Sequence, residues 1–178
     1  VGVLLRPEIR AAQPEDRGHV LAYARRAAPE STLAALRDCG REVRVYGLGQ
    51  RPRSGAMTFH AIDPYRFVED LATCTALVTT AGNQLVGESL FLGKPVLAMP
   101  EEGNYEQEIN ATYLVRAGAG MAHSFEGLRS MDVRRFLDRV PTFQERLRGW
   151  DLDGLPQALA RIDAHLASPS TAAPPVPV

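Results

Sequence analysis

LVTTAGNQLVGESLFLGKPVLAMPEEGNYEQEIN, residues 77–110, is the stretch that decides the fold of this chain. An apolar run, Ala76–Val78, leads through two threonines to Gly82, and a segment of helical character follows and stops at Gly93. A second apolar run then covers Val96–Met99. The order strand, tight glycine turn, helix, strand predicts one βαβ unit of a parallel sheet.

Two polar clusters lie just past the carboxyl ends of the two predicted strands. The first covers residues 80–88 and the second covers residues 101–110. Ligands of parallel α/β sheets bind at this edge. The two clusters therefore predict a ligand site at this edge, which we interpret, together with the resemblance described below, as half of a site for a nucleotide-linked sugar.

The rest of the chain alternates strand and helix patterns around this unit. Further strands are expected at 18–24, 42–46 and 57–62 and near Ala122, and further helices from about 30 to 40, from Pro64, at 105–117 and within 125–166, with breaks at Pro141 and 149–154. This alternation predicts an α/β fold with a doubly wound, Rossmann-like parallel sheet.

Composition divides the chain into three parts. Residues 1–17 carry two prolines and several charges with little periodicity, and we expect them to be the remnant of an interdomain linker. Residues 18–167 form the domain proper. Residues 168–178 consist mostly of Ser, Pro, Ala and Val, and such a tail is expected to be disordered because it cannot bury enough apolar surface.

Length and charge exclude several classes of protein. The 178 residues suit one domain, and a net charge of -1 does not favour nucleic acid as the partner. No apolar run approaches the roughly 20 residues of a membrane span. Two isolated cysteines predict neither a disulfide framework nor a zinc site, so a reducing cytoplasm is the expected location.

The glycine turn is the first candidate site. In Ala81-Gly82-Asn83-Gln84 a strand runs into a helix, which presents free backbone N–H groups and the positive end of the helix dipole to a phosphate. The alternative is a tight turn in which Asn83 is an ordinary helix cap. The spacing alone leaves both interpretations open.

Glu88, six positions after Gly82, is the second candidate. A carboxylate there can accept hydrogen bonds from two hydroxyl groups at once, as the diol of a ribose requires. The alternative is a solvated glutamate on a helix surface. Gly87 beside it and the apolar neighbours Val86 and Leu90 favour the binding interpretation.

The third candidate is the start of the next helix, Glu106-Gln107 with Asn110. Carboxylate and amide groups suit sugar hydroxyls, which both donate and accept hydrogen bonds. Alternatively, Asn104 caps this helix and Gln107 completes a capping box. Both can hold together, because Glu106 and Gln107 point in different directions.

The remaining polar residues give weaker signals. Arg25 and Arg26 could reach a diphosphate, although a solvated arginine pair is the simpler interpretation. The four histidines show no metal-ligand spacing. No nucleophile stands beside a base, so we expect no catalytic residue in this chain, no metal and no cofactor.

The spaced residues of the central stretch resemble a known family. Gly82-x5-Glu88, Gly93-Lys94-Pro95 and Glu106-Gln107-x2-Asn110-Ala111 together are similar to the carboxyl-terminal, donor-binding domain of GT-B fold glycosyltransferases, in the family-28-like and UDP-glycosyltransferase branch. The resemblance is strongest over residues 67–120 and extends over 18–166. Residues 5–9, LRPEI, also resemble the interdomain linker of some bacterial members.

The resemblance implies a role for each cluster. The diphosphate of a nucleotide sugar would lie against the turn, and the ribose hydroxyls would bind Glu88. The base would lie against the backbone near Ile62, and no metal would be needed. The donor is a substrate, not a cofactor, and the general base would come from the amino-terminal domain. The remaining residues implied are Thr80, Gly82, Asn83 and Gln84 for the diphosphate and Glu106, Gln107 and Asn110 for the sugar.

Two departures from the family pattern bear on the identity of the donor. Many members carry Ser or Thr three residues after the turn glycine, where this chain has Leu85, and Asn83 or Gln84 is available in its place. Plant-type members carry His two residues before the glycine, where this chain has Thr80.

The implied function is a hexosyltransferase whose donor, a UDP-linked hexose, binds this chain. A missing amino-terminal domain, in the same chain or a partner chain, would hold the acceptor, and the fragment alone is expected to be inactive. Two alternatives stay open: a non-catalytic nucleotide-sugar-binding subunit, and a nucleotide-sugar epimerase or hydrolase on the same fold. The expected location is the cytoplasm or the inner face of the membrane, and peripheral membrane contact also stays open.

Overall fold

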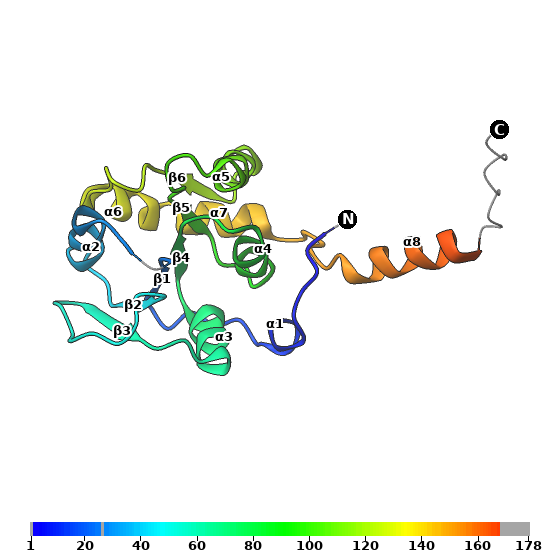
Figure 1. Cartoon of the computed structure of the whole chain (residues 1–178), viewed down its shortest axis with the longest axis horizontal. Helices are drawn as coiled ribbons and strands as arrows, with labels where there is room; N and C mark the ends of the chain where they lie inside the picture. The colour runs from blue at the N-terminus through cyan, green and yellow to red at the C-terminus, as the bar shows by residue number, and fades with distance from the viewer. Residues whose placement is uncertain (1, 26, 168–178) are drawn as a thin grey trace, which may run out of the picture.

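The computed structural model of the chain describes residues 2–25 and 27–167 and has three layers, with one parallel sheet between two layers of helices (Figure 1). The sheet has six strands in the order β3-β2-β1-β4-β5-β6. Every neighbouring pair is parallel, which confirms the predicted doubly wound α/β fold. The strands are β1 (Val20–Tyr23), β2 (Val43–Tyr46), β3 (Met57–His60), β4 (Ala76–Thr79), β5 (Val96–Ala98) and β6 (Gly120–Ala122).

The winding of the sheet reverses between β1 and β4. Val20 of β1 lies opposite Val43 of β2 on one side and Ala76 of β4 on the other. The chain builds outward from β1 through β2 to β3, then returns to the middle and builds outward again from β4. Such a reversal leaves a crevice outside the carboxyl ends of the two central strands.

Helices cover both faces of the sheet. One core contains Leu77 of β4 and lies under α1, α3, α4 and α5, while the other contains Ala76 and Val78 and lies under α2, α6 and α7. The alternation along β4 follows the two-residue period of a strand that is buried on both faces. The helices are α1 (Pro7–Ala11), α2 (Glu30–Arg37), α3 (Pro64–Thr73), α4 (Asn83–Phe91), α5 (Tyr105–Ala117), α6 (Ser130–Asp138) and α7 (Val140–Leu147).

The last helix, α8 (Leu155–Ala167), extends away from the sheet and its layers (Figure 1). It contains no buried residue. In the described part of the chain, no helix is long and apolar enough to cross a membrane. The predicted tail, residues 168–178, lies outside the described residues.

Two local features of the structure were not predicted from the sequence. Residues 1–17, the expected linker remnant, have little periodicity in the sequence, yet Pro7–Ala11 forms a short helix whose Ile9 is fully buried. Five residues are too few to show a helical period in the sequence. Pro141 was expected to break a helix, but the break falls at Arg139 and Pro141 lies in the first turn of α7. Proline is tolerated there because its missing N–H would have no helical partner.

Candidate functional site

A cleft of about 270 Å³ lies at the carboxyl ends of β1 and β4, where the winding of the sheet reverses. We call it the switch-point cleft. Three of the predicted site residues line it: Ile62 follows β3, and Gln84 and Glu88 lie on α4. The whole lining consists of Arg6, Tyr23, Ile62, Pro64, Phe67, Gln84, Leu85 and Glu88.

One wall of the cleft is apolar and aromatic. The ring of Tyr23, the last residue of β1, packs edge-on against Phe67 with 5.9 Å between centroids. Phe67 in turn packs edge-on against Tyr46, at 5.1 Å. Ile62 is 63% exposed, so its side chain is free to contact a ligand in the cleft. Sequence reasoning placed Ile62 there but missed Tyr23 and Phe67.

A buried polar support lies behind this wall. The hydroxyl of Tyr46 donates to Asp70 Oδ2 at 2.5 Å, and Arg44 donates to Asp70 Oδ1 at 2.6 Å. Burial, followed by the hydrogen bond to Asp70, raises the pKa of Tyr46, so this hydroxyl stays protonated. The network fixes the ring on which Phe67 rests.

Glu88 is buried, with 1% of its surface exposed, so its interpretation as a solvated helix glutamate is wrong. Both carboxylate oxygens accept from Arg6: Oε1 from Nε and Oε2 from Nη2, each at 2.7 Å. Gln84 Nε2 donates to Oε1 as well, at 2.9 Å. Glu88, the residue predicted to bind the ribose, is thus held by a bidentate ion pair with Arg6 in the switch-point cleft.

Arg6 is the polar residue that sequence reasoning missed. It precedes α1 and stands 82 positions from Glu88, so no local pattern links the two. The hydrogen bond to Glu88 is the largest cause that raises the pKa of Arg6. The only signal was the LRPEI segment, which was interpreted as a linker and not as part of the site.

The turn between β4 and α4 is strained at Ala81 and not at Gly82. Ala81 has φ +66°, a conformation that L-residues rarely adopt, whereas Gly82 has φ -61° and ψ 132°. A Cβ atom on Gly82 would meet nothing within 4 Å. Neither backbone geometry nor packing therefore requires a glycine here, and the position is open to whatever approaches the turn.

Backbone N–H groups are available at this turn. The first intrahelical hydrogen bond of α4 runs from Val86 N–H to the carbonyl of Gly82. The N–H groups of residues 83–85 precede it and have no partner within the helix. Gly82 is the N-cap residue and Asn83 is the first helical residue, so the alternative interpretation of Asn83 as the cap is wrong.

The two polar clusters meet, as their positions after parallel strands led us to expect. Asn110 of α5 donates from Nδ2 to the carbonyl of Ala81 at 2.9 Å. This hydrogen bond holds the strained turn from the side of the neighbouring βα unit. Asn110 therefore supports the turn and is engaged with protein.

Gln107 also makes its contacts within the protein. It is buried, its Oε1 accepts from Glu101 N–H at 2.8 Å, and its Nε2 donates to Glu101 Oε2 at 3.3 Å. Asn104 caps α5 by accepting from Gln107 N–H at 3.3 Å, but the side chain of Gln107 turns to Glu101, so the reciprocal bond of a capping box is not made. Glu106 is exposed, which fits the expectation that the two point in different directions.

Helix α4 separates the predicted residues into two groups. Gln84 and Glu88 face the switch-point cleft, whereas Asn83 faces a second hollow of about 330 Å³ between α4 and α5, which Asn110 also lines. Thr80 is buried and lines neither. The structure thus brings Ile62, Gln84 and Glu88 together, and it places the other predicted residues around the same strand ends but outside this cleft.

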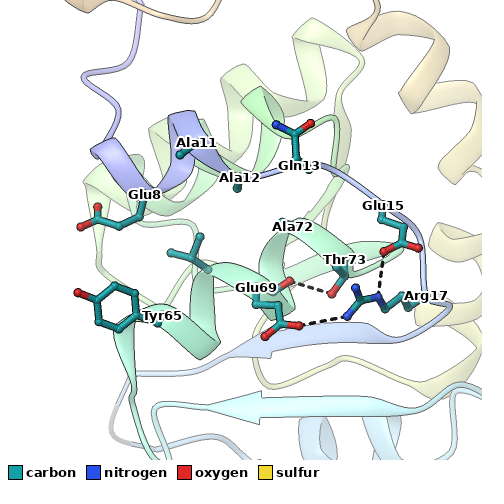
Figure 2. A pocket seen from close by; sticks show the side chains of 11 residues that line it. Glu8, Ala11, Ala12, Gln13, Glu15, Arg17, Tyr65, Glu69, Ala72 and Thr73 are labelled. Atoms are coloured by element: carbon teal, nitrogen blue, oxygen red, sulfur yellow. Dashed lines mark hydrogen bonds and ion pairs between the residues drawn. The ribbon is translucent and has the colours of Figure 1, made fainter.

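A hollow of about 480 Å³ lies between α3 and the segment that carries α1, away from the predicted residues (Figure 2). Arg17 lines one side of it and forms ion pairs with Glu15 at 3.0 Å and with Glu69 at 3.2 Å (Figure 2). None of the predicted site residues lines it. We therefore take the switch-point cleft as the candidate site.

No group of three or more His, Cys, Asp or Glu residues that could hold a metal ion occurs among residues 2–25 and 27–167. Arg25 is exposed, and Arg26 lies outside the described residues. The groups available to a ligand at this site are therefore the aromatic wall, the buried Glu88 with Arg6 and the amino-terminus of α4.

Comparison with known proteins gives a family match and curated relatives. A family model described as glycosyl transferase family 1 matches residues 1–141. An uncharacterized glycosyltransferase of Methanosarcina mazei is 31% identical over 110 residues, which are 54% of this chain and 28% of the relative. One of Methanosarcina acetivorans is 45% identical over 49 residues, 28% of this chain and 13% of the relative.

Solved structures of the same fold are also glycosyltransferases. CalG4, the calicheamicin glycosyltransferase, superimposes with a TM-score of 0.65 at 19% identity over 92% of this chain and 46% of CalG4. Os79 from O. sativa, in complex with UDP, gives a TM-score of 0.60 at 15% identity over 89% of this chain and 42% of Os79. The chain thus spans less than half of each, and its sheet matches the carboxyl-terminal half of the GT-B fold.

Proposed function

This chain belongs to glycosyl transferase family 1, and from that premise we propose that it binds the nucleotide-diphosphate sugar donor of a glycosyltransferase. The donor is a UDP-linked hexose. The acceptor is held by a further domain, in the same chain or in a partner, and this chain alone transfers no sugar.

The switch-point cleft is the observation that carries the proposal. It joins an exposed apolar side chain, Ile62, with a buried carboxylate, Glu88, and lies beside the amino-terminus of α4. A nucleoside diphosphate offers a flat base, a diol and two phosphates in the same order. An apolar cleft with a few convergent polar groups at the carboxyl edge of a parallel sheet is the usual form of such a site.

Each part of the donor then has a partner. The base lies against Ile62 and the aromatic wall, and the ribose hydroxyls lie at Glu88. The diphosphate lies at the turn with Gly82, where the N–H groups of residues 83–85 precede the helix bonds. The hexose extends toward α5, where Glu106 offers an exposed carboxylate and Gln107 holds Glu101 in place.

The chemistry that this chain contributes is positioning and charge stabilisation. Transfer leaves a nucleoside diphosphate, whose negative charge grows as the bond to the sugar breaks. Fixed N–H groups and the helix dipole stabilise that charge without having to reorient. The proton of the acceptor is removed by a group outside this chain.

Matched substitutions at two exposed apolar residues test the base subsite. Ile62 and Met131 are 63% and 61% exposed, so an aspartate at either position costs little core packing. We expect calorimetric titration to show that UDP binds the wild type and Met131→Asp alike and binds Ile62→Asp more weakly. A wild type that binds no nucleoside diphosphate, or equal affinities for all three proteins, would refute the proposal.

A further inference from the structure

We propose that Arg6 is a donor-binding residue that exchanges its partner: it pairs with Glu88 in the empty cleft and with the donor diphosphate once the nucleotide is bound. The inference rests on the proposed function. It follows from the number of hydrogen bonds that Glu88 can accept and from the charge-assisted hydrogen bonds that Arg6 can offer to a second anion.

The carboxylate of Glu88 is almost saturated in the empty cleft. Each carboxylate oxygen has two lone pairs. Oε1 accepts from Arg6 Nε and Gln84 Nε2, and Oε2 accepts from Arg6 Nη2, which leaves one free position. A ribose diol needs two. Glu88 can therefore bind both hydroxyls only if Arg6 or Gln84 releases a bond, and Arg6, which holds two of the three, is the donor that a diphosphate can draw away.

The same contacts cover the carboxylate. Glu88 is 1% exposed, whereas the side chain of Arg6 is 41% exposed and lines the cleft. A ligand entering the cleft thus meets the guanidinium before the carboxylate. Arg6 has five N–H donors and gives two of them to Glu88, so three remain for an incoming acceptor.

A nucleoside diphosphate supplies what the exchange needs. An arginine that releases its carboxylate gives up charge-assisted hydrogen bonds, and a second anion restores them. The diphosphate is such an anion, and the guanidinium fork matches phosphate oxygens in a bidentate manner. A nucleoside without phosphates offers hydroxyls to Glu88 but nothing to Arg6.

The two positions that the exchange connects lie on neighbouring turns of α4. Glu88 and Gln84 are one turn apart on α4, about 6 Å along the helix axis at a rise of about 1.5 Å per residue. Gln84 lies on the first of these turns, and its Nε2 donates to Glu88 at 2.9 Å and to the carbonyl of Leu4 at 3.0 Å. Arg6 needs to swing only from the second turn of α4 toward its amino-terminus.

Titration with uridine and with UDP distinguishes Arg6 paired with Glu88 from Arg6 paired with the donor diphosphate. Arg6→Met keeps the aliphatic stem but removes the charge. It should weaken UDP binding by about ten- to a hundredfold, the effect of losing one charge-assisted hydrogen bond. Uridine should bind Arg6→Met more tightly than the wild type, because Glu88 no longer has to be released. The two ligands therefore respond in opposite directions.

Arg10→Met is the matched control. Arg10 stands one helical turn further along the same segment and forms an ion pair with Asp153, outside the cleft. Its replacement should leave the affinities for both ligands as in the wild type. An unchanged UDP affinity in Arg6→Met, or an equal loss for uridine and UDP, would overturn the exchange.

A measurement on the wild type covers the case in which Arg6→Met does not fold. The Nε–Hε resonance of Arg6, assigned by comparison with Arg6→Lys, should shift when UDP saturates the cleft. A resonance that stays in place at saturation overturns the exchange alone. A wild type that binds no nucleoside diphosphate overturns the proposed function and the exchange together.

Discussion

The side-chain amide of Asn110 donates a 2.9 Å hydrogen bond to the main-chain carbonyl of Ala81. Ala81 is the residue with φ +66° between β4 and α4, and Asn110 lies on α5, the next helix of the sheet. One hydrogen bond thus joins the two polar clusters and supports the strained peptide that aims the amino-terminus of α4.

Removing that support should destabilise the turn. Asn110→Ala loses the bond to Ala81, and we expect the free energy of unfolding to fall by about 1–2 kcal/mol. Ala81→Gly should recover much of the loss in the double variant, because glycine adopts positive φ without the steric cost that L-residues carry. Urea denaturation of the two single variants and the double variant measures both effects. A double variant no more stable than Asn110→Ala would contradict this account of the turn.

The Arg6–Glu88 pair should contribute to stability by a moderate amount. Glu88 is buried, but the side chain of Arg6 is 41% exposed and can be rehydrated when its partner is lost. Glu88→Gln is therefore expected to lower the free energy of unfolding by about 1–3 kcal/mol, less than the loss of a partner in a fully buried pair. A double-mutant cycle with Arg6→Met measures the coupling. A coupling near zero would show that the two groups do not depend on each other.

Acidification should destabilise the fold through His19. Burial, followed by the positive charge of Arg44, lowers the pKa of His19, whose ring is buried and whose Nε2 contacts the carbonyl of Asp70 at 3.0 Å. The unfolded chain takes up a proton near the usual pKa of about 6.5, while the folded chain does not. Stability is therefore complete above that pH and falls as the pH drops below it.

Unfolding free energies at pH 7.5 and pH 5.5 check this sign. Burial also lowers the pKa of His60, so this residue adds to the loss of unfolding free energy between pH 7.5 and pH 5.5. His19→Gln should reduce the difference, and His165→Gln, on the exposed helix α8, should leave it in place. A wild type that gains stability at the lower pH would contradict the assignment of His19 as a neutral buried ring.

Glu106 and Glu108 give a matched test of the sugar subsite. Both are exposed carboxylates in the first turn of α5, but Glu108 lines a different hollow, beside β6. Glu106→Gln should reduce the advantage in affinity of a UDP-hexose over UDP by about 1.5–3 kcal/mol, because a charge-assisted hydrogen bond to the sugar is lost. Glu108→Gln should leave the affinity advantage of a UDP-hexose over UDP unchanged. Calorimetry with UDP and UDP-glucose measures the difference, and equal behaviour of the two variants would remove Glu106 from the site.

The sequence predicted the fold well where the chain carries explicit end signals. Residues 105–117 were expected to form a helix, and α5 has these bounds, because Asn104 caps its start and Gly118 ends it in the left-handed conformation. The βαβ unit was recognised from its glycine turn and its two apolar runs. Helix α1 was missed because five residues give too little periodicity to detect.

The site was only partly predictable, for a physical reason. Glu88 was proposed as a site residue from its distance to the turn, but its partner Arg6 is 82 residues away, and only the folded chain brings the two together. The bond between Asn110 and Ala81, 29 residues apart, has no sequence signal either. Local sequence patterns therefore indicated which polar side chains follow the strands. The contacts that orient those side chains became visible only in the structure.

Titration of wild type and Gly82→Ala with UDP tests the central claim most directly. Gly82 has φ -61° and open space where a Cβ would lie, so alanine should leave the fold intact. The free energy of unfolding should change by less than about 1 kcal/mol, because the lower entropy of the unfolded chain offsets the poorer helix cap that alanine provides. A methyl group there would stand where the diphosphate must approach the backbone. We expect UDP to bind the wild type and to bind Gly82→Ala at least about tenfold more weakly, a difference of about 1.4 kcal/mol. Equal UDP affinity in a stable Gly82→Ala would contradict the placement of the diphosphate at this turn.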